Sequence, residues 1–279
     1  MSDRRRLAVL LAPVALLVLL AAAWLMPAVA GLQLERRGDD ARRWEAALDA
    51  LPSDPVVLVG FDPDLGTYAE IRPTVRTLLA DLLNRGARLA FVNLTPEGRA
   101  LLLAELDRLE RAEANPTRLL DLGYVPGAEA ALVSLVRELP LREQTGSLAR
   151  QLAAGGGIEA IDAAVVVGGN DIGPRSWVEQ VAPRVGDLPL LAVAPTVLLP
   201  ELLPYLESGQ LAGLLATPGE GAAYRAGAAL GPLDRLVEAP PSGSLPILAG
   251  LVVAIVFLAQ AWLGRAIAGA RQLMAPDDA

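Results

Sequence analysis

The sequence predicts an α/β protein with a Rossmann-like, doubly wound, mainly parallel sheet of about six strands, flanked in the chain by N- and C-terminal transmembrane helices. Two observations lead to this prediction. Short apolar runs alternate with amphipathic helical patterns through the middle of the chain, and repeated strand–helix units form parallel sheets covered by helices. Long uncharged apolar stretches lie near both ends, and the mean hydropathy of +0.41 is high for a soluble protein of 279 residues.

The first apolar segment, residues 7–30, follows a short basic tail, residues 1–6, and contains no charged residue. It supplies the ~20 apolar residues that a helix needs to cross the hydrocarbon core, so it predicts a transmembrane helix. The alternative is a cleaved signal peptide, because Ala28-Val29-Ala30 resembles a cleavage site. The apolar stretch is longer than the usual signal-peptide core of ~7–15 residues, and this favours the membrane helix.

The second apolar segment, residues 245–263, follows a Pro/Gly/Ser-rich linker, residues 239–244. A short tail, residues 264–279, carries two arginines directly after it. Its length and its flanks predict a second transmembrane helix, and a buried core helix is the alternative.

Orientation in the membrane is predicted from the arginines, which favour the cytoplasmic side. They flank the outer ends of both apolar segments, and further arginines lie on the domain side of the first. The intervening domain is long, and long domains cross the membrane largely regardless of charge, so the short tails decide. We expect a cell-membrane protein with two spans, cytoplasmic termini and an extracytoplasmic α/β domain.

Composition excludes several kinds of chemistry. Cysteine, histidine and lysine are absent, and all 24 basic residues are arginine. This removes thiolate nucleophiles, zinc sites of the usual ligands, Ser-His-Asp triads, P-loop lysines and Schiff bases. Residues 35–244 carry 19 Arg and 29 Asp plus Glu, so their net charge is 19 − 29 = −10. This charge disfavours nucleic acid and anionic lipid headgroups as partners.

The α/β domain is expected over residues 52–238, after a linker helix in residues 31–51. Six apolar runs predict its strands, and a helical pattern follows each of them. The strands are expected at residues 56–61, 89–94, 119–125, 163–167, 190–194 and 211–215.

Local patterns predict how some of these elements begin and end. Thr67 and Glu70 have the spacing of a capping box at the start of the helix after the first strand. Thr95-Pro96 predicts an N-cap followed by proline at the first helical position. Pro183 is expected to end the short helix around Trp177, and residues 142–157 read as a polar, glycine-rich excursion.

Candidate site residues lie where strands end, because ligands of open α/β sheets bind there. Asp62 and Asp64 follow the first strand, Thr95 the second and Asp171 the fourth. This pattern resembles the haloacid-dehalogenase-type phosphatases, in which one Asp attacks phosphorus, another is the acid/base and further acids hold Mg²⁺. The lysine of such sites is missing here. The alternative is that these acids cap helices and turns, as loop acids commonly do, so no catalytic or metal-binding residue is assigned.

Glycine-rich segments give no nucleotide-binding signature. Gly168-Gly169 lacks the G-x-G-x-x-G spacing, and Gly155-Gly156-Gly157 precedes a strand rather than following one. Both are interpreted as turn glycines, and no cofactor is expected.

Three segments carry a family resemblance. Residues 57–62 with 70–73 resemble a V-L-V-S-F-D-Y strand that leads to a P-E-L-x-P helix. Residues 122–130 are similar to L-G-Y-K-P-G-G-E, and residues 208–215 to S-G-Q-L-x-G-L-L. These segments are typical of an uncharacterised prokaryotic membrane-protein family with a transmembrane helix at each end and a central α/β domain.

The resemblance covers most of the chain and implies the same architecture. The sequence departs from the pattern at Pro63, where the family has Tyr, and at Val125, where it has Lys. The family has no established activity, so no functional residue is carried over.

Two classes of function follow from these observations. The favoured one is a non-enzymatic, membrane-anchored binding or scaffolding module in a membrane assembly, whose partners are other membrane proteins or copies of itself. A chain without His, Cys or Lys has few groups that can activate a nucleophile near neutral pH, whereas binding needs only a shaped surface. The alternative is a Mg²⁺-dependent phosphohydrolase that uses Asp62 and Asp64.

Overall fold

The computed structural model of the chain describes residues 39–112, 115–169, 172–217, 219–228, 233 and 237. The predicted membrane segments at 7–30 and 245–263, with their tails and the linker at 239–244, lie outside these residues. No helix within the described ranges is long and apolar enough to cross a membrane. The compact unit that contains the sheet runs from Glu35 to Ala239.

A single six-stranded sheet forms the centre of the described domain, and every pair of neighbouring strands is parallel. The spatial order is β3-β2-β1-β4-β5-β6, which is the strand order of Rossmann-type folds. This confirms the predicted parallel α/β sheet, and the reversal of order between β1 and β4 is consistent with a doubly wound fold. The strands are β1 Val56–Asp62, β2 Arg88–Asn93, β3 Leu119–Tyr124, β4 Ala163–Gly168, β5 Leu190–Pro195 and β6 Gly213–Thr217.

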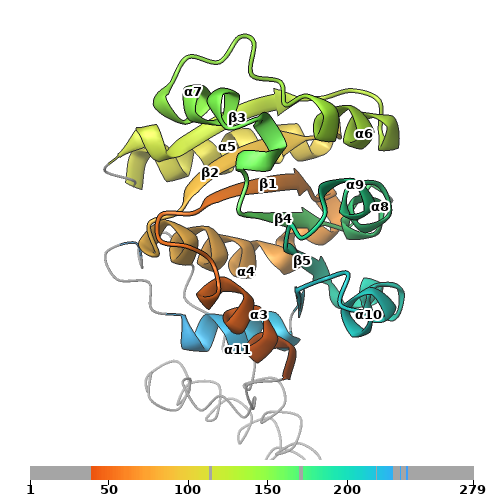
Figure 1. Ribbon diagram of the computed structural model, residues 1–279. Coiled ribbons are helices and arrows are strands. Elements are labelled where there is room, and N and C mark those ends of the chain that lie inside the picture. Colours follow the sequence, from red (N-terminus) through yellow and green to blue (C-terminus); the bar gives the residue numbers. More distant parts are fainter. Residues whose placement is uncertain are drawn as a thin grey trace, which may run out of the picture. The chain divides into compact units, whose positions relative to one another are not determined.

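Helices cover both faces of the sheet (Figure 1). One face packs against α3 Asp39–Asp49, α4 Leu65–Asn84, α5 Pro96–Ala112 and α11 Gly219–Gly227. The other packs against α6 Glu129–Arg137, α7 Ser147–Ala154, α8 Pro174–Gln180, α9 Ala182–Val185 and α10 Leu199–Glu207. Short 3₁₀ turns lie at η1 Pro116–Arg118, η2 Gly157–Ala160 and η3 Thr196–Leu198.

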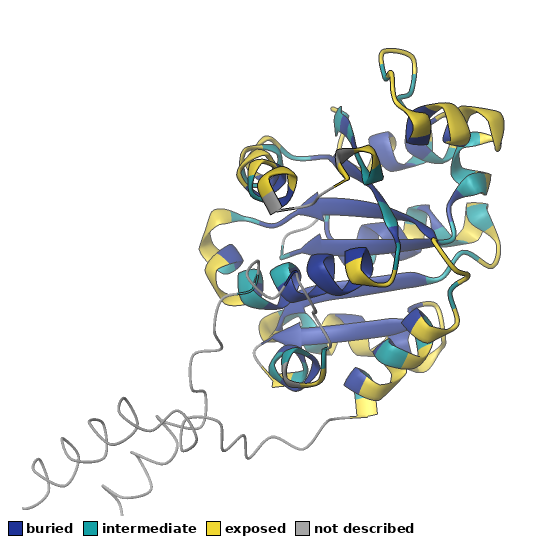
Figure 2. Ribbon diagram, turned by 90° about the vertical axis from the view of Figure 1, so that its left-hand side faces the viewer, coloured by how far each residue is buried: buried dark blue, intermediate teal, exposed yellow. Residues whose placement is uncertain are grey.

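The central strands are apolar at nearly every position because both of their faces are buried (Figure 2). In β1, Val57 and Val59 belong to one core cluster, and Val56 and Leu58 belong to the other. Gly60 leaves room for the indole ring of Trp177, since a Cβ there would lie 2.3 Å from a ring carbon. The glycine in this strand is therefore required by the close approach of α8.

Three local expectations were wrong in detail. Helix α4 begins at Leu65 rather than after Thr67, because Asp64 is its N-cap and accepts a hydrogen bond from Thr67 N at 2.9 Å. Pro183 lies in the first turn of α9 rather than ending a helix, and proline is tolerated there because its nitrogen needs no acceptor. The excursion at 142–157 contains α7, whose apolar face packs into the core.

Ala128, which directly precedes α6, has an unfavourable backbone conformation with φ 52° and ψ −127°. This region is natural for glycine and costly for residues with a Cβ. We expect Ala128→Gly to raise the free energy of unfolding by about 1 kcal/mol, measured by denaturant titration of the full chain in mild detergent. Ala130→Gly, at an exposed position inside α6, is the matched control and should lower stability by about 0.5–1 kcal/mol. Loss of stability in the first variant would contradict the strain.

Candidate functional site

The candidate residues gather at the carboxyl edge of the sheet, meaning the edge where the strands end. Strand β1 lies between β2 and β4, and Asp62 at its end is the register partner of Gly168. Since β1 and β4 flank the reversal of strand order, this is the place where open α/β sheets bind ligands.

Asp62 joins the end of β1 to the loop that follows β2. Its Oδ1 atom accepts hydrogen bonds from Leu94 N at 2.8 Å, from Thr95 N at 2.8 Å and from Thr95 Oγ1 at 2.9 Å. The side-chain amide of Asn93 donates to Phe61 O and links the same two strands. The sequence-predicted pair of Asp62 and Thr95 is thus brought into direct contact.

The first turn of α5 covers Asp62. Pro96 begins this helix as predicted, and Thr95 Oγ1 accepts from Gly98 N at 3.0 Å. A Cβ at Gly98 would lie 2.6 Å from Phe61 O and 2.8 Å from Asp62 Cα, so only glycine allows so close an approach. As a result Asp62 is 1% exposed.

Burial raises the pKa of Asp62 to about 6, although the hydrogen bonds from Leu94 and Thr95 act to lower it. Desolvation penalises the ionised carboxylate, and the three donors offset only part of this penalty. Asp62 is therefore an acid that titrates below neutral pH inside the fold.

Asp64 has a separate role at the start of α4. Its carboxylate accepts from Thr67 N and from Thr67 Oγ1. Burial acts to raise the pKa of Asp64, but the hydrogen bonds from Thr67, with those from the backbone of Gly66 and of Asp64, together outweigh it and hold the pKa below its usual value. A Cβ at Gly169 would lie 2.4 Å from Thr67 Oγ1, so the segment after β4 packs directly on this cap. The negative charge at the helix N-terminus also makes this end unfavourable for phosphate.

Asp171 lies outside the described residues. Within the described ranges, no group of three or more acidic, histidine or cysteine side chains is placed to hold a metal ion. Of the predicted site residues, the structure joins Asp62 to Thr95, while Asp64 contacts Thr67 instead.

The sequence pattern does not predict the exposure of two apolar side chains at this edge. Leu65 follows β1 and Asp64 and is 67% exposed; Val197 follows β5 and is 76% exposed. Glu70 links α4, which begins at Leu65, to the segment that contains Val197, because its carboxylate accepts a hydrogen bond from Thr196 N at 3.4 Å. Leu65 lies three residues before the buried Tyr68, so helical periodicity predicts burial for it. No sequence signal reveals its exposure.

A separate cavity of about 690 Å³ lies beside the end of β3 and is lined by Tyr124, Arg137 and the chain that follows α6. Its lining includes none of the predicted site residues. Comparison of this chain with models of known families, with curated proteins and with solved structures gives no match, so the site is described from its geometry alone.

Proposed function

We propose that this chain is a membrane-tethered binding or scaffolding module that works within a membrane assembly. Segments 7–30 and 245–263 hold it in the lipid bilayer, with both termini in the cytoplasm and the α/β domain outside. Its partners are other membrane proteins or further copies of the same chain. The absence of His, Cys and Lys supports a role that depends on surface rather than on proton transfer.

One observation carries this proposal. At the carboxyl edge, Asp62 and Asp64 make hydrogen bonds within the fold, whereas apolar side chains are exposed. Asp62 binds three donors and is covered by α5, and Asp64 caps α4. Leu65 and Val197 are the two most exposed of the large apolar residues among those described. Exposed apolar groups at a ligand-binding edge favour contact with another protein.

The phosphohydrolase alternative is less well supported by this geometry. A nucleophilic aspartate must reach a phosphorus atom, and Asp62 has almost no exposed surface.

Charge placed at the carboxyl edge should abolish assembly. We expect the double variant Leu65→Asp/Val197→Asp to lose its crosslinked partner in intact membranes and to run as the monomer in mild detergent. Leu103→Asp is the matched control, because Leu103 is 49% exposed and lies within α5, not in a segment that directly follows a strand. An unchanged crosslinking pattern in the double variant, or a monomeric mass for the parent chain, would contradict the proposal.

The absence of cysteine also allows a test of topology. A single cysteine in Ser147→Cys, at an exposed position outside the proposed contact surface, should react with a membrane-impermeant maleimide in intact cells if the domain lies outside. Mass spectrometry of the material that co-purifies after gentle extraction then distinguishes a second copy from another membrane protein. Labelling that requires cell lysis would reverse the proposed orientation.

A further inference from the structure

Helices α3 and α11 lie side by side in the fold (Figure 1), although α3 is the first and α11 the last described helix in the sequence. Ala41 N in α3 donates to Glu220 Oε2 in α11 at 3.0 Å. The buried rings of Trp44 and Tyr224 meet edge to face, with centroids 6.0 Å apart. Each helix therefore covers apolar surface of the other.

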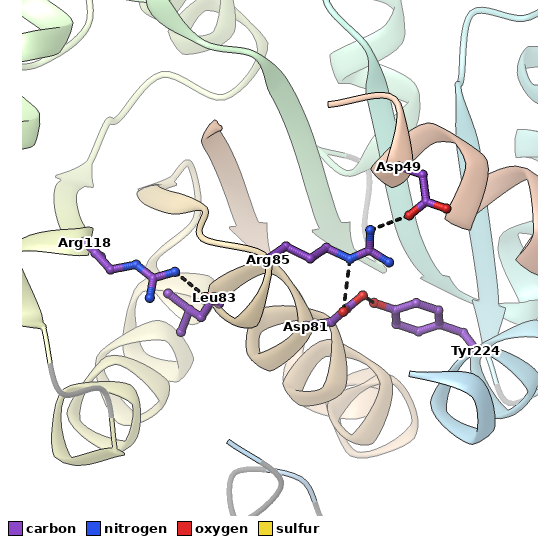
Figure 3. Close-up of polar contacts among 6 residues, drawn as sticks. All are labelled: Asp49, Asp81, Leu83, Arg85, Arg118 and Tyr224. Carbon is purple, nitrogen blue, oxygen red and sulfur yellow. Dashed lines mark hydrogen bonds and ion pairs between the residues drawn. The ribbon is translucent and has the colours of Figure 1, made fainter. Parts of the chain in front are cut away.

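A polar network joins this pair of helices to α4 (Figure 3). Tyr224 OH in α11 donates to Asp81 Oδ2 in α4 at 2.6 Å. Arg85, the C-cap residue of α4, donates through Nε to Asp81 Oδ1 at 3.1 Å and through Nη1 to Asp49 in α3 at 2.5 Å. A single buried carboxylate, that of Asp81, is thus connected to both helices.

A second contact fixes α11 to α4 further along the helix. Arg225 Nη1 donates to Thr74 Oγ1 at 2.8 Å. Gly221 allows this approach, since a Cβ there would lie 2.5 Å from the same hydroxyl. Helix α11 is therefore held to α4 at two points, Thr74 and Asp81, and not at one.

Networks of this kind open and close together. Asp81 is buried, and a buried carboxylate oxygen that loses its donor is left without a hydrogen-bond partner at a cost in free energy. Loss of the Tyr224 bond consequently weakens the site that also holds Arg85 and, through it, Asp49. Cooperative opening of such contiguous units is the usual form of local unfolding.

We propose that α3 and α11 form a latch, meaning that the two helices open and close on α4 as a single cooperative unit. In the sequence, α3 is the first described helix after the first apolar segment, and α11 is the last described helix before the second. Helix α4 has 20 residues and spans ~30 Å, from Leu65 at the carboxyl edge to the latch contacts at Asp81 and Arg85. This connection to Leu65 rests on the proposed function; the latch itself does not.

Hydrogen exchange of the full chain in mild detergent tests the latch. Tyr224→Phe removes the bond to Asp81 and should speed exchange roughly tenfold or more in α3 and α11 together, the scale expected for a lost bond to a charged group. Tyr205→Phe is the matched control, because Tyr205 OH bonds to Glu179 on the exposed surface. Exchange in β1 and β4 should stay slow in both variants.

The reverse experiment tests reciprocity. Trp44→Phe in α3 should speed exchange in α11 as much as in α3. If each variant loosens only its own helix, the two helices are not one unit and the proposal is wrong. Should a variant unfold the whole domain, Glu220→Gln, which weakens only the bond from Ala41, gives the same comparison. None of these measurements needs a partner, so failure of the latch and failure of the contact surface are distinguishable.

Discussion

Replacement of Glu105 by leucine should lower the free energy of unfolding by about 3–5 kcal/mol. Glu105 in α5 and Arg76 in α4 form a buried ion pair in which the guanidinium donates to both carboxylate oxygens, at 2.6, 2.9 and 3.1 Å. Tyr68 lies beside the same carboxylate. Burial together with the charge of Glu105 raises the pKa of the Tyr68 hydroxyl. Replacement of Glu105 removes these hydrogen bonds from a largely buried guanidinium, and this loss dominates the effect.

The double variant Arg76→Met/Glu105→Leu should recover most of this stability. Apolar side chains of similar volume avoid the desolvation penalty that the ion pair has to offset. Asp107→Asn breaks an exposed ion pair with Arg111 on the same helix α5 and should change stability by less than about 0.5 kcal/mol. Denaturant unfolding of the parent chain and these three variants provides the comparison, and a double variant no more stable than Glu105→Leu would show that the two side chains do not act as a pair.

This ion pair illustrates which parts of the fold a sequence reveals. Strands β1, β4 and β5 were predictable because each is a nearly continuous apolar run between helical patterns. The pairing of Arg76 with Glu105 was not, because it depends on how α4 packs against α5. The strand order likewise depends on the face that each crossover helix covers, which the local pattern does not specify.

The candidate site was predictable to the same extent. Asp62 and Thr95 come together because they end neighbouring parallel strands, and the N-cap role of Thr95 follows from Thr95-Pro96. The N-cap of α4 was placed wrongly, since Asp64 and Thr67 are both suitable capping residues and the spacing to Glu70 favoured Thr67. Coverage of Asp62 depends on the close approach of Gly98, a tertiary contact with no local signature.

Substitutions of Asp62 should have the second large effect on the free energy of unfolding. Two variants separate the contribution of its hydrogen bonds from that of its charge. Asp62→Ala removes the acceptor of Leu94 N, Thr95 N and Thr95 Oγ1, so it should lower stability by about 3–5 kcal/mol relative to Asp62→Asn at any one pH. The asparagine variant keeps an oxygen acceptor in the same place and removes the ionisable group. Denaturant unfolding of the two variants in mild detergent measures the difference. Equal stabilities would mean that these bonds contribute little.

The charge of Asp62 should appear as a pH dependence. The pKa of this carboxyl is about 6 in the folded state and 3.8 when it is unperturbed, so between these values the folded protein holds a proton that the unfolded chain has released. The stabilisation is complete below about pH 4 and is lost as the pH rises through 6, by at most about 3 kcal/mol at 1.36 kcal/mol per pKa unit. Asp62→Asn cannot titrate there, so its stability relative to the parent chain should rise by about 2–3 kcal/mol between pH 4 and pH 7. A difference that stays constant over this range would mean that Asp62 titrates normally, and hence that the turn of α5 above it admits water.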